Sequence, residues 1–354
     1  MAALGRESHY VRQSYLRRWL APSSSKLWAY RTLVPRPDFD VWEESSPWSV
    51  ARRRDFYTSV EGPDKESDRI ERWLNDEVEN PAIPVLDKLC RGEALTAKDR
   101  RKLARYIASL DARHPLHYLE YTALMSQHVG GVIDSMLEEQ VKDLTHRVKN
   151  GLPLPEVPKD YKSHSIGVVF DHGDEATGED PTVSVNLVIG REGWLDSIEH
   201  LVNDVSRFLE PHDWHVVRPH AGWTWYSSDH PVVRLRFNGL DKYDLKGRYG
   251  DPGTEIMLPL SPHQLLYTQA ARSPKLGEAL SLEQTCLVKR FIAENAFRWV
   301  ISANQVRHAA WFRPRIVNRD QFNFEENERE KFHEEQKRAE LEVTNAKRPA
   351  AKAS

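Results

Sequence analysis

The sequence predicts an α+β protein in which a helical N-terminal half packs on a mixed or antiparallel sheet and a C-terminal helix closes the core. Three changes in the spacing of apolar residues lead to this prediction. Between residues 63 and 150 the apolar residues recur with the helical period. Between 160 and 260 they alternate as in strands, and over 281–303 the helical period returns.

Composition limits the classes of protein. The chain has 354 residues, of which 40% are hydrophobic and 29% charged, as in globular rather than disordered proteins. Its net charge of −3 argues against a wholly basic protein that coats nucleic acid. The sequence has no secretory leader and no apolar run of the roughly 18 residues that a transmembrane helix needs. Its two cysteines fit buried thiols in a reducing compartment, so we expect a cytoplasmic protein without membrane association.

Residues 1–62 are expected to form a basic arm, a short strand and a surface loop. Residues 1–36 carry seven lysines and arginines and one acid. This charge fits two interpretations: the arm docks on the acidic stretch 61–79, or it binds an anion. A short strand is expected from Leu27, whereas residues 35–62 show little period and predict a long loop.

Residues 63–150 predict a helical region. Asn80–Pro81 is typical of a cap followed by the first helical residue. Thr96 and Asp99 have the spacing of a capping box, with Asp in place of the usual Glu. Pro115 is expected to break or kink the next helix, and Gly130–Gly131 to separate the last helix from the one before it.

Residues 151–318 predict a proline-rich linker, a sheet and the closing helix. Strands are expected over 165–170, 182–189, 214–217, 224–226, 232–237, 256–260 and 311–317. Helices are expected over 195–209 and 281–303. Residues 319–354 predict a charged helix that frays into a disordered tail.

No complete catalytic motif is present. The sequence lacks a GxSxG elbow, a GxxxxGK[ST] or GxGxxG phosphate loop, and a CxxC or HExxH zinc motif. Lone polar residues in apolar helices are more informative, because a buried charge is costly unless it is paired. Glu71 and Arg113 either pair across two helices or line a pocket, and Asn304 follows an apolar stripe that ends at Val300–Ile301.

Residues 9–19 (HYVRQSYLRRW), 227–232 (SSDHPV) and 257–262 (MLPLSP) together resemble the motifs of a bacterial family called domain of unknown function 4238. Residues 9–19 (HYVRQSYLRRW) are similar to its opening motif, His-Tyr-Val-Pro-Gln-aromatic-Tyr-Leu-Arg-x-Phe. Residues 27–30 resemble its next strand, and residues 70–89 with Arg113-x-Pro115 resemble its helical middle. Residues 227–232 (SSDHPV) and 257–262 (MLPLSP) are similar to its Thr-Ser-Asp-Asn-Pro-Val and Phe-Pro-Leu-Ser-Pro segments. Together these matches extend over residues 9–315.

The resemblance implies a fold, a bacterial origin and a cytoplasmic location, but it names no settled activity. Three positions depart from the family pattern. Arg12 replaces a proline, Ser14 an aromatic residue and His230 an asparagine. If the asparagine side chain contacts a ligand in the family, His230 puts that contact in doubt.

Ten polar residues are candidates for the functional site. Asp229 either completes an Asx turn before Pro231 or lies at a strand end, where ligand-binding loops gather. His9 is either a buried, hydrogen-bonded side chain or a general base with a pKa of about 6.5. No residue is assigned to a metal, and a divalent-ion cofactor is left open. The candidates for catalysis are His9, Glu71, Arg113, Asp229 and Asn304, and those for binding are Tyr10, Arg17, Arg18, Ser228 and His230.

Two functional hypotheses follow. The first is an enzyme that acts on a nucleotide or a nucleic-acid phosphodiester, in a host-defence or mobile-element setting. The basic arm with its interleaved aromatic residues and the isolated polar residues favour it. The second is a non-enzymatic module that binds or senses a protein partner; it predicts that Asp229→Ala is tolerated and that changes at exposed tryptophans or arginines of the arm weaken the complex.

Overall fold

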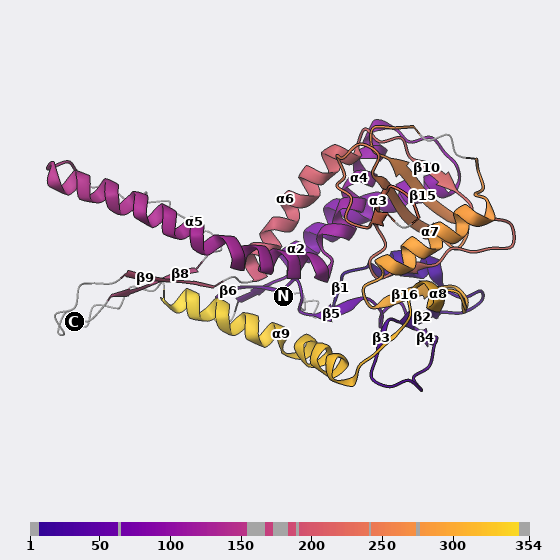
Figure 1. The fold of residues 1–354 in the computed structure, drawn as a ribbon, viewed down its shortest axis with the longest axis horizontal. Helices are drawn as coiled ribbons and strands as arrows, with labels where there is room; N and C mark the ends of the chain where they lie inside the picture. The colour runs from indigo at the N-terminus through magenta and orange to yellow at the C-terminus, as the bar shows by residue number, and fades with distance from the viewer. Residues whose placement is uncertain are drawn as a thin grey trace. The chain divides into compact units, whose positions relative to one another are not determined.

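A computed structural model describes the chain, and the chain divides into two compact units (Figure 1). The structure describes residues 7–62, 65–153, 167–172, 183–188, 191–240, 242–273 and 277–346. The first unit consists of Met1–Thr58, Ser67–Pro115 and Ser197–His333, and the second of Ser59–Glu66, Leu116–Asp196 and Glu334–Ser354. The sequence predicts four consecutive segments, 1–62, 63–150, 151–318 and 319–354, and this division into domains stays a prediction.

Two antiparallel sheets form the core of the first unit, so the α+β prediction is confirmed. In spatial order, the five-stranded sheet consists of β10 (His215–Val217), β15 (Gln264–Gln269), β14 (Glu255–Ser261), β12 (Val233–Phe237) and β13 (Tyr243–Asp244). The four-stranded sheet consists of β11 (Ser227–Ser228), β16 (Trp299–Ser302), β2 (Leu27–Arg31) and β4 (Glu43–Ser45). The strand expected over 224–226 is wrong, because these residues form no strand and β11 begins only at Ser227; β15 was not expected from the sequence.

The closing helix is shorter than the sequence predicts. Helix α7 (Leu282–Asn295) begins with a capping box at Ser281 and packs on β11 and β12. The backbone then turns extended at Ala296, with ψ of 134°. Residues 299–302 are therefore not helical. They form β16, which pairs with both β11 and β2 and is buried along its whole length. The aromatic and β-branched residues of this segment fit a central strand better than a helix.

The helical region of the first unit starts with α2 (Arg69–Trp73), continues through a wide π-helical turn, η2 (Leu74–Glu79), and leads directly into α3 (Asn80–Cys90). A helix therefore starts where the sequence predicts, but Asn80 does not cap it. Asn80 is itself helical, and its side chain accepts a hydrogen bond from Arg12 at 2.8 Å. Helix α4 (Ala97–Ala112) has the predicted capping box between Thr96 and Asp99.

Two strands of the N-terminal segment pair with strands that come later in the chain. Strand β1 (Glu7–His9) pairs with β5 (Arg52–Arg54), and the chain continues through α1 (Gln13–Leu16) and a 3-10 turn, η1 (Arg17–Trp19). Strand β3 (Leu33–Val34) pairs in parallel with β17 (Ile316–Val317). The expected surface loop over 35–62 is wrong in part, because it contains β4 and β5 and buries Phe56 and Tyr57. This segment is ordered because β4 and β5 pair with strands elsewhere in the chain. The spacing of neighbouring apolar residues gives no sign of such pairing.

The second unit contains the long helix α5 (Pro115–Lys149) and the antiparallel strands β8 (Gly167–His172) and β9 (Val183–Val188). The expected break at Gly130–Gly131 is wrong, because α5 runs through both glycines. An exposed glycine costs a helix about 1 kcal/mol and need not end it. Arg191, at the start of α6 (Arg191–Leu209), is buried and forms two contacts with Glu340 of α9 (Arg319–Ala346), at 2.9 and 3.2 Å.

The remaining elements are short. They are β6 (Ser59–Gly62), β7 (Lys65–Ser67) and α8 (Ala309–Phe312), so the edge strand expected over 311–317 is reduced to β17. The C-terminal helix is present as α9, and the expected disordered tail lies outside the described residues, as do the ends of the strands expected over 165–170 and 182–189. None of the described helices is long and apolar enough to cross a membrane.

Thr96→Ala should lower the free energy of unfolding by about 1 kcal/mol, because it removes the acceptor for the Asp99 amide at the start of α4. The Asp99 carboxylate also bonds Lys88, which with Thr96 holds the pKa of Asp99 at about 2. Urea unfolding measures the loss. Thr96→Ser, which keeps the hydroxyl, is the control and should stay within a few tenths of a kcal/mol of the wild type; equal stability of both variants would contradict the role of the cap.

Candidate functional site

A polar cavity of about 470 Å³ lies in the first unit, between the N-terminal segment, α2 with its wide turn, and the end of α4. Four of the ten residues predicted from the sequence line it: His9, Arg17, Glu71 and Arg113. The structure therefore supports the interpretation that Glu71 and Arg113 line one pocket. The other residues that line it are Arg12, Gln13, Ser14, Tyr57, Asp68, Arg72, Leu74, Asn75 and Glu79.

Arg113 is the buried cation of this cavity. It follows the last residue of α4 and is only 3% exposed. Its ion pair is with Glu79, at 2.5 Å, so the expected direct pair with Glu71 is replaced by a pair with a different glutamate. The guanidinium atoms Nε and Nη2 have no hydrogen-bond partner in the part of the chain that the structure describes. A buried donor without a partner costs free energy, and a guanidinium matches the geometry of a carboxylate or a phosphate.

Glu79 is shared between two arginines. Its second carboxylate oxygen lies 3.1 Å from Nη1 of Arg12, whose other terminal nitrogen donates to Asn75 and Asn80. Arg12 thus docks the basic arm on the acidic stretch, as one of the two interpretations of the arm proposes. One buried carboxylate faces two guanidinium groups, which leaves the local charge of this triad positive.

Glu71 is the titratable acid of the cavity. Its carboxylate accepts a hydrogen bond from the buried hydroxyl of Ser8 at 3.3 Å. Burial raises the pKa of Glu71 to about 7, and the contacts with Ser8 and the charge of Arg113 only partly offset this effect. A carboxyl group with a pKa near neutrality can both accept and donate a proton under physiological conditions.

The N-terminal segment contributes two more groups. Nε2 of His9 lies 3.0 Å from the backbone carbonyl of Trp48, so this nitrogen carries the proton of the contact. Arg17 is exposed, lines the cavity and has no hydrogen-bond or ion-pair partner among the described residues. Tyr57, which the sequence analysis placed in a surface loop, is buried here, and its hydroxyl donates to the backbone carbonyl of Arg113 at 2.8 Å.

A second group of predicted residues lies in a buried cluster: Asp229 with Tyr10, Ser228 and His230. The carboxylate of Asp229 accepts hydrogen bonds from the amides of Phe297 and Arg298, both at 2.9 Å, and from the hydroxyl of Tyr10 at 3.3 Å. Burial raises the pKa of Asp229, and the backbone N–H donors oppose that effect. Asp229 is fully buried and does not line the cavity.

His230 and Ser228 stabilise the turn around Asp229. The hydroxyl of Ser228 both donates to the carbonyl of His230 and accepts from its amide. The His230 ring stacks on His114, with centroids 4.3 Å apart, and its Nε2 lies 3.1 Å from Asp111. The hydroxyl of Tyr249 donates to the other oxygen of Asp111 at 2.7 Å.

The last two candidates lie outside both groups. Arg18 pairs with Asp87 of α3 at 2.6 Å, which lies beyond the acidic stretch 61–79 of the docking interpretation. Asn304 is exposed in the turn after β16, where its amide contacts the hydroxyl of Ser302 at 3.4 Å. The structure thus divides the predicted residues into four in the cavity, four in the buried cluster and two elsewhere.

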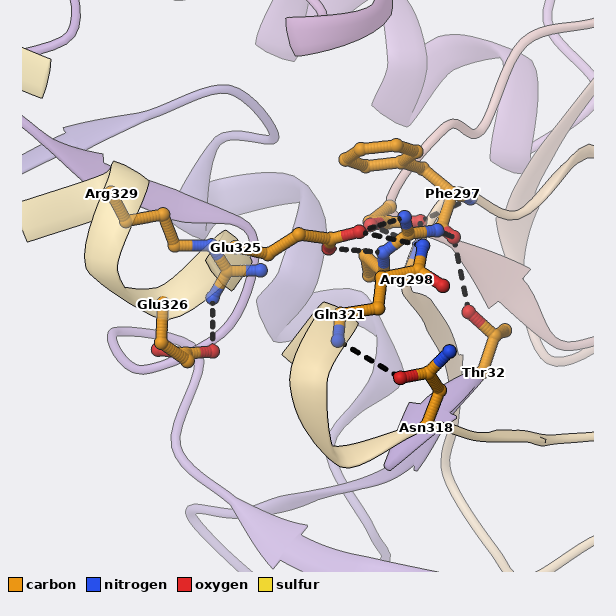
Figure 2. Close-up of polar contacts among 9 residues, drawn as sticks. Thr32, Phe297, Arg298, Asn318, Gln321, Glu325, Glu326 and Arg329 are labelled. Atoms are coloured by element: carbon orange, nitrogen blue, oxygen red, sulfur yellow. Dashed lines mark hydrogen bonds and ion pairs between the residues drawn. The ribbon is translucent and has the colours of Figure 1, made fainter. Parts of the chain in front are cut away.

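The contacts around Asp229 extend to the C-terminal helix. Figure 2 shows the side chain of Arg298 directed toward the first turns of α9, where Glu325 accepts hydrogen bonds from both Nε and Nη2, at 2.7 and 2.6 Å. The carbonyl of the neighbouring Phe297 accepts a bond from Thr32 of the segment after β2. Contacts with Asp229, Thr32 and Glu325 therefore fix the turn at residues 297–298.

Sequence reasoning missed Glu79, Arg12 and Tyr57. Glu79 follows Val78 of the predicted apolar stripe, but the wide turn over Leu74–Glu79 changes which side chains face inward. The departure of Arg12 from the proline of the family motif was a usable signal, because a charged residue there requires a partner. Within the described residues, no group of three or more histidine, cysteine or acidic side chains is arranged to hold a metal ion.

Comparison with known proteins gives one match. A family model described as protein of unknown function (DUF4238) matches residues 8–305. The chain belongs to this family. No curated protein and no solved structure is significantly similar to this chain. The DUF4238 region includes both the cavity and the buried cluster. The structure also explains why three of its motifs occur together: the hydroxyl of Tyr15 contacts Ser227 at 2.7 Å and the carbonyl of Pro259 at 2.5 Å.

Asp229→Ala should lower the free energy of unfolding by about 3–5 kcal/mol, because the amides of Phe297 and Arg298 would stay buried without an acceptor. Urea unfolding followed by circular dichroism measures the loss. Asp229→Asn keeps one acceptor oxygen and should lose less. A Asp229→Ala variant as stable as the wild type would rule out a structural role for this carboxylate.

Glu71→Gln should make the protein more stable at pH 8 and change little at pH 4. The folded-state pKa of about 7 lies above the ordinary value of 4.5, so the wild type loses stability as the pH rises from about 4.5 through 7, when Glu71 must ionise in place. Since the side chain is only partly buried, the gain at pH 8 should be about 1–2 kcal/mol. Unfolding at several pH values tests this; the exposed Glu77, changed to Gln, is the control and should leave the pH profile unchanged.

Proposed function

We propose that this protein is an enzyme that hydrolyses a phosphodiester of a nucleotide or nucleic acid in the polar cavity. The observation that carries the proposal is that one cavity combines a buried arginine with two unpartnered nitrogens, Arg113, and a carboxyl group with a pKa near 7, Glu71. Strongly perturbed pKa values in a concave polar site are typical of catalytic groups.

Arg113 and Arg17 are proposed to hold the phosphate. The free Nε and Nη2 of Arg113 offer two donors on one edge of the guanidinium, the arrangement that binds phosphate oxygens in pairs. The side chain of Arg17 is exposed and has no partner among the described residues, and it would add a second positive charge at the same cavity. Together they would balance the negative charge that develops on the phosphoryl oxygens in the transition state.

Glu71 is proposed to transfer the proton. As a carboxylate it would accept a proton from a water molecule while that oxygen forms a bond to phosphorus and the bond to the leaving oxygen breaks. The protonated Glu71 would then return the proton to the leaving group. His9 lies in the same cavity and is proposed to contact the substrate, whereas Asp229 with Tyr10 is proposed to position the N-terminal segment. Asn304 has no place in this proposal.

The alternative of a binding module uses the same cavity. Arg113 and Arg17 would then bind an anionic group of a ligand or partner without turnover. The stable ion pair of Arg113 with Glu79 is the observation that favours it, since a preorganised cation suffices for binding. A cytoplasmic location and a bacterial origin stay predictions under either function.

Glu71→Gln should lower the rate of phosphodiester hydrolysis 10²–10⁴-fold, the usual contribution of general acid–base catalysis. Bis(p-nitrophenyl) phosphate and a dinucleotide serve as substrates between pH 5 and 9, and the wild-type rate should rise through a pKa of about 7. The matched control is Glu77→Gln, on the same helical segment but outside the cavity.

Arg17→Gln tests the anion site without disturbing a buried contact. It should raise KM about tenfold and leave the stability unchanged. Hydrolysis that is unaffected by Glu71→Gln would refute the enzymatic proposal. Anion binding that needs Arg17 and Arg113, with no hydrolysis of any substrate in the wild type, would support the binding module instead.

A further inference from the structure

A second cavity, of about 560 Å³, lies in the same unit and is lined by arginines that neither the sequence analysis nor the proposed function uses. Three of them are consecutive residues of β5, and the other two come from β2 and from the first part of α9. The two cavities share the β1–β5 pair: His9 lines the first cavity, and its register partner Arg52 lines the second. The five arginines are Arg31, Arg52, Arg53, Arg54 and Arg329.

The charge of this second cavity is only partly neutralised. Two glutamates, Glu326 and Glu330, line it beside the five arginines. Arg329 pairs with Glu326 at 2.9 Å, as Figure 2 shows on α9. Glu330 is exposed to solvent. With Glu43 and Asp55, which pair with two of these arginines, four carboxylates face the five arginines, so an excess of one positive charge remains among the described residues.

Two further arginines of the cavity have carboxylate partners outside it. Arg31 pairs with Glu43, and Arg54 pairs with the neighbouring Asp55, both at 3.3 Å. The Arg54 side chain is exposed, whereas the carboxylate of Asp55 is buried, so the guanidinium keeps a face open to a further anion.

Arg53 is the clearest sign of a missing anion. It is half-buried and its side chain has no hydrogen-bond or ion-pair partner among the described residues; the carboxylate of Glu325 acts on its charge but is itself bonded to Arg298. Its guanidinium contacts the ring of Phe56, 5.2 Å from the centroid. Burial lowers the pKa of Arg53, which means that the charged form pays a desolvation cost that an anion would offset.

Aromatic side chains accompany the arginines. The guanidinium of Arg52 stacks over Trp48 at 3.8 Å, and that of Arg31 stacks over Trp299 at 4.1 Å. Trp48 is about half exposed, with 48% of its surface accessible. Positively charged grooves with aromatic platforms are the usual way in which proteins hold single-stranded nucleic acid.

We infer that the groove formed by Arg31, Arg52, Arg53, Arg54 and Arg329 binds the backbone of a single-stranded nucleic acid. Arg52, Arg53 and Arg54 all line the cavity although successive side chains of a strand alternate between its faces, so β5 offers several positive charges there to a chain of phosphates. The arginines lie in a concavity, which an extended strand can enter. A rigid duplex presents its phosphates on a convex surface and fits less well.

This inference rests on the proposed function in one respect. It takes the ligand of the groove to be the class of molecule, a nucleic acid, that the polar cavity is proposed to hydrolyse. If the polar cavity hydrolyses a phosphodiester, the adjoining arginine groove makes that phosphodiester part of a polymer rather than a mononucleotide. Binding by the groove and hydrolysis in the cavity are measured separately, so either can fail alone.

The test is fluorescence anisotropy of the full-length protein with a labelled 20-nucleotide oligothymidylate at several salt concentrations. Arg53→Gln should weaken binding at least fivefold and reduce the slope of log K against log salt by about 0.7, the value for one phosphate contact with a single strand. Arg53→Lys keeps the charge and should keep the slope. Arg100→Gln is the matched control, because Arg100 is exposed on α4 and has no side-chain partner among the described residues.

A triple change of Arg52, Arg53 and Arg54 to Gln should remove most of the binding, while Glu77→Gln, exposed and outside both cavities, should bind the oligonucleotide like the wild type. Thermal unfolding checks that each variant is folded. Oligonucleotide binding that is absent, or unaffected by Arg53→Gln, would overturn the inference, as would a duplex that binds as tightly as the single strand. If the wild type binds the oligonucleotide through the groove but hydrolyses no substrate, the inference stands and the enzymatic function is refuted. If the wild type hydrolyses bis(p-nitrophenyl) phosphate but does not bind the oligonucleotide, the enzymatic function stands and the inference is refuted.

Discussion

The carboxylate of Asp229 is fully buried, and a buried carboxylate persists only where donors surround it. Here those donors come from remote parts of the chain: the amides of Phe297 and Arg298, which precede β16, and the hydroxyl of Tyr10 near the start of the fold. Arg298 continues the connection to Glu325 of α9. The need to satisfy one carboxylate thus fixes the N-terminal segment, the central strand and the first turns of the last helix against each other.

The position of Tyr10 has consequences for the cavity, because Ser8 and His9 precede it directly. Ser8 contacts Glu71, and His9 lines the cavity while its ring contacts the carbonyl of Trp48. The short pairing of β1 with β5 then places Arg52 opposite His9. Two groups of residues that are separate in space, the buried cluster and the cavity, are therefore coupled through three consecutive residues.

Local signals in the sequence predict local structure well and distant contacts poorly. The capping box at Thr96 depends on neighbouring residues, so the sequence alone predicts it, whereas the cap predicted at Asn80 is wrong because the helical backbone continues from Glu79 into α3. The contact of Tyr10 with Asp229 joins residues 219 positions apart, and no local period reports it. The ten candidate residues were selected by type and motif, which identifies polar residues in apolar surroundings but cannot separate a ligand contact from a structural acceptor. Only the tertiary arrangement shows that Glu71 and Arg113 face one cavity while Asp229 faces backbone amides.

The electrostatics of the cavity link the binding of an anion to the binding of a proton. Glu79 faces both Arg12 and Arg113, so the two arginines share one negative charge, and Arg113 keeps two unpartnered nitrogens. Burial keeps Glu71 close to half protonated at neutral pH, so it does not fully cancel the remaining positive charge. An anion held by Arg113 would add a negative charge beside Glu71 and raise its pKa further, which favours the protonated acid. A bound phosphate would in this way raise the pH above which Glu71 is the carboxylate that accepts a proton from water, and release of the anion would lower that pH again.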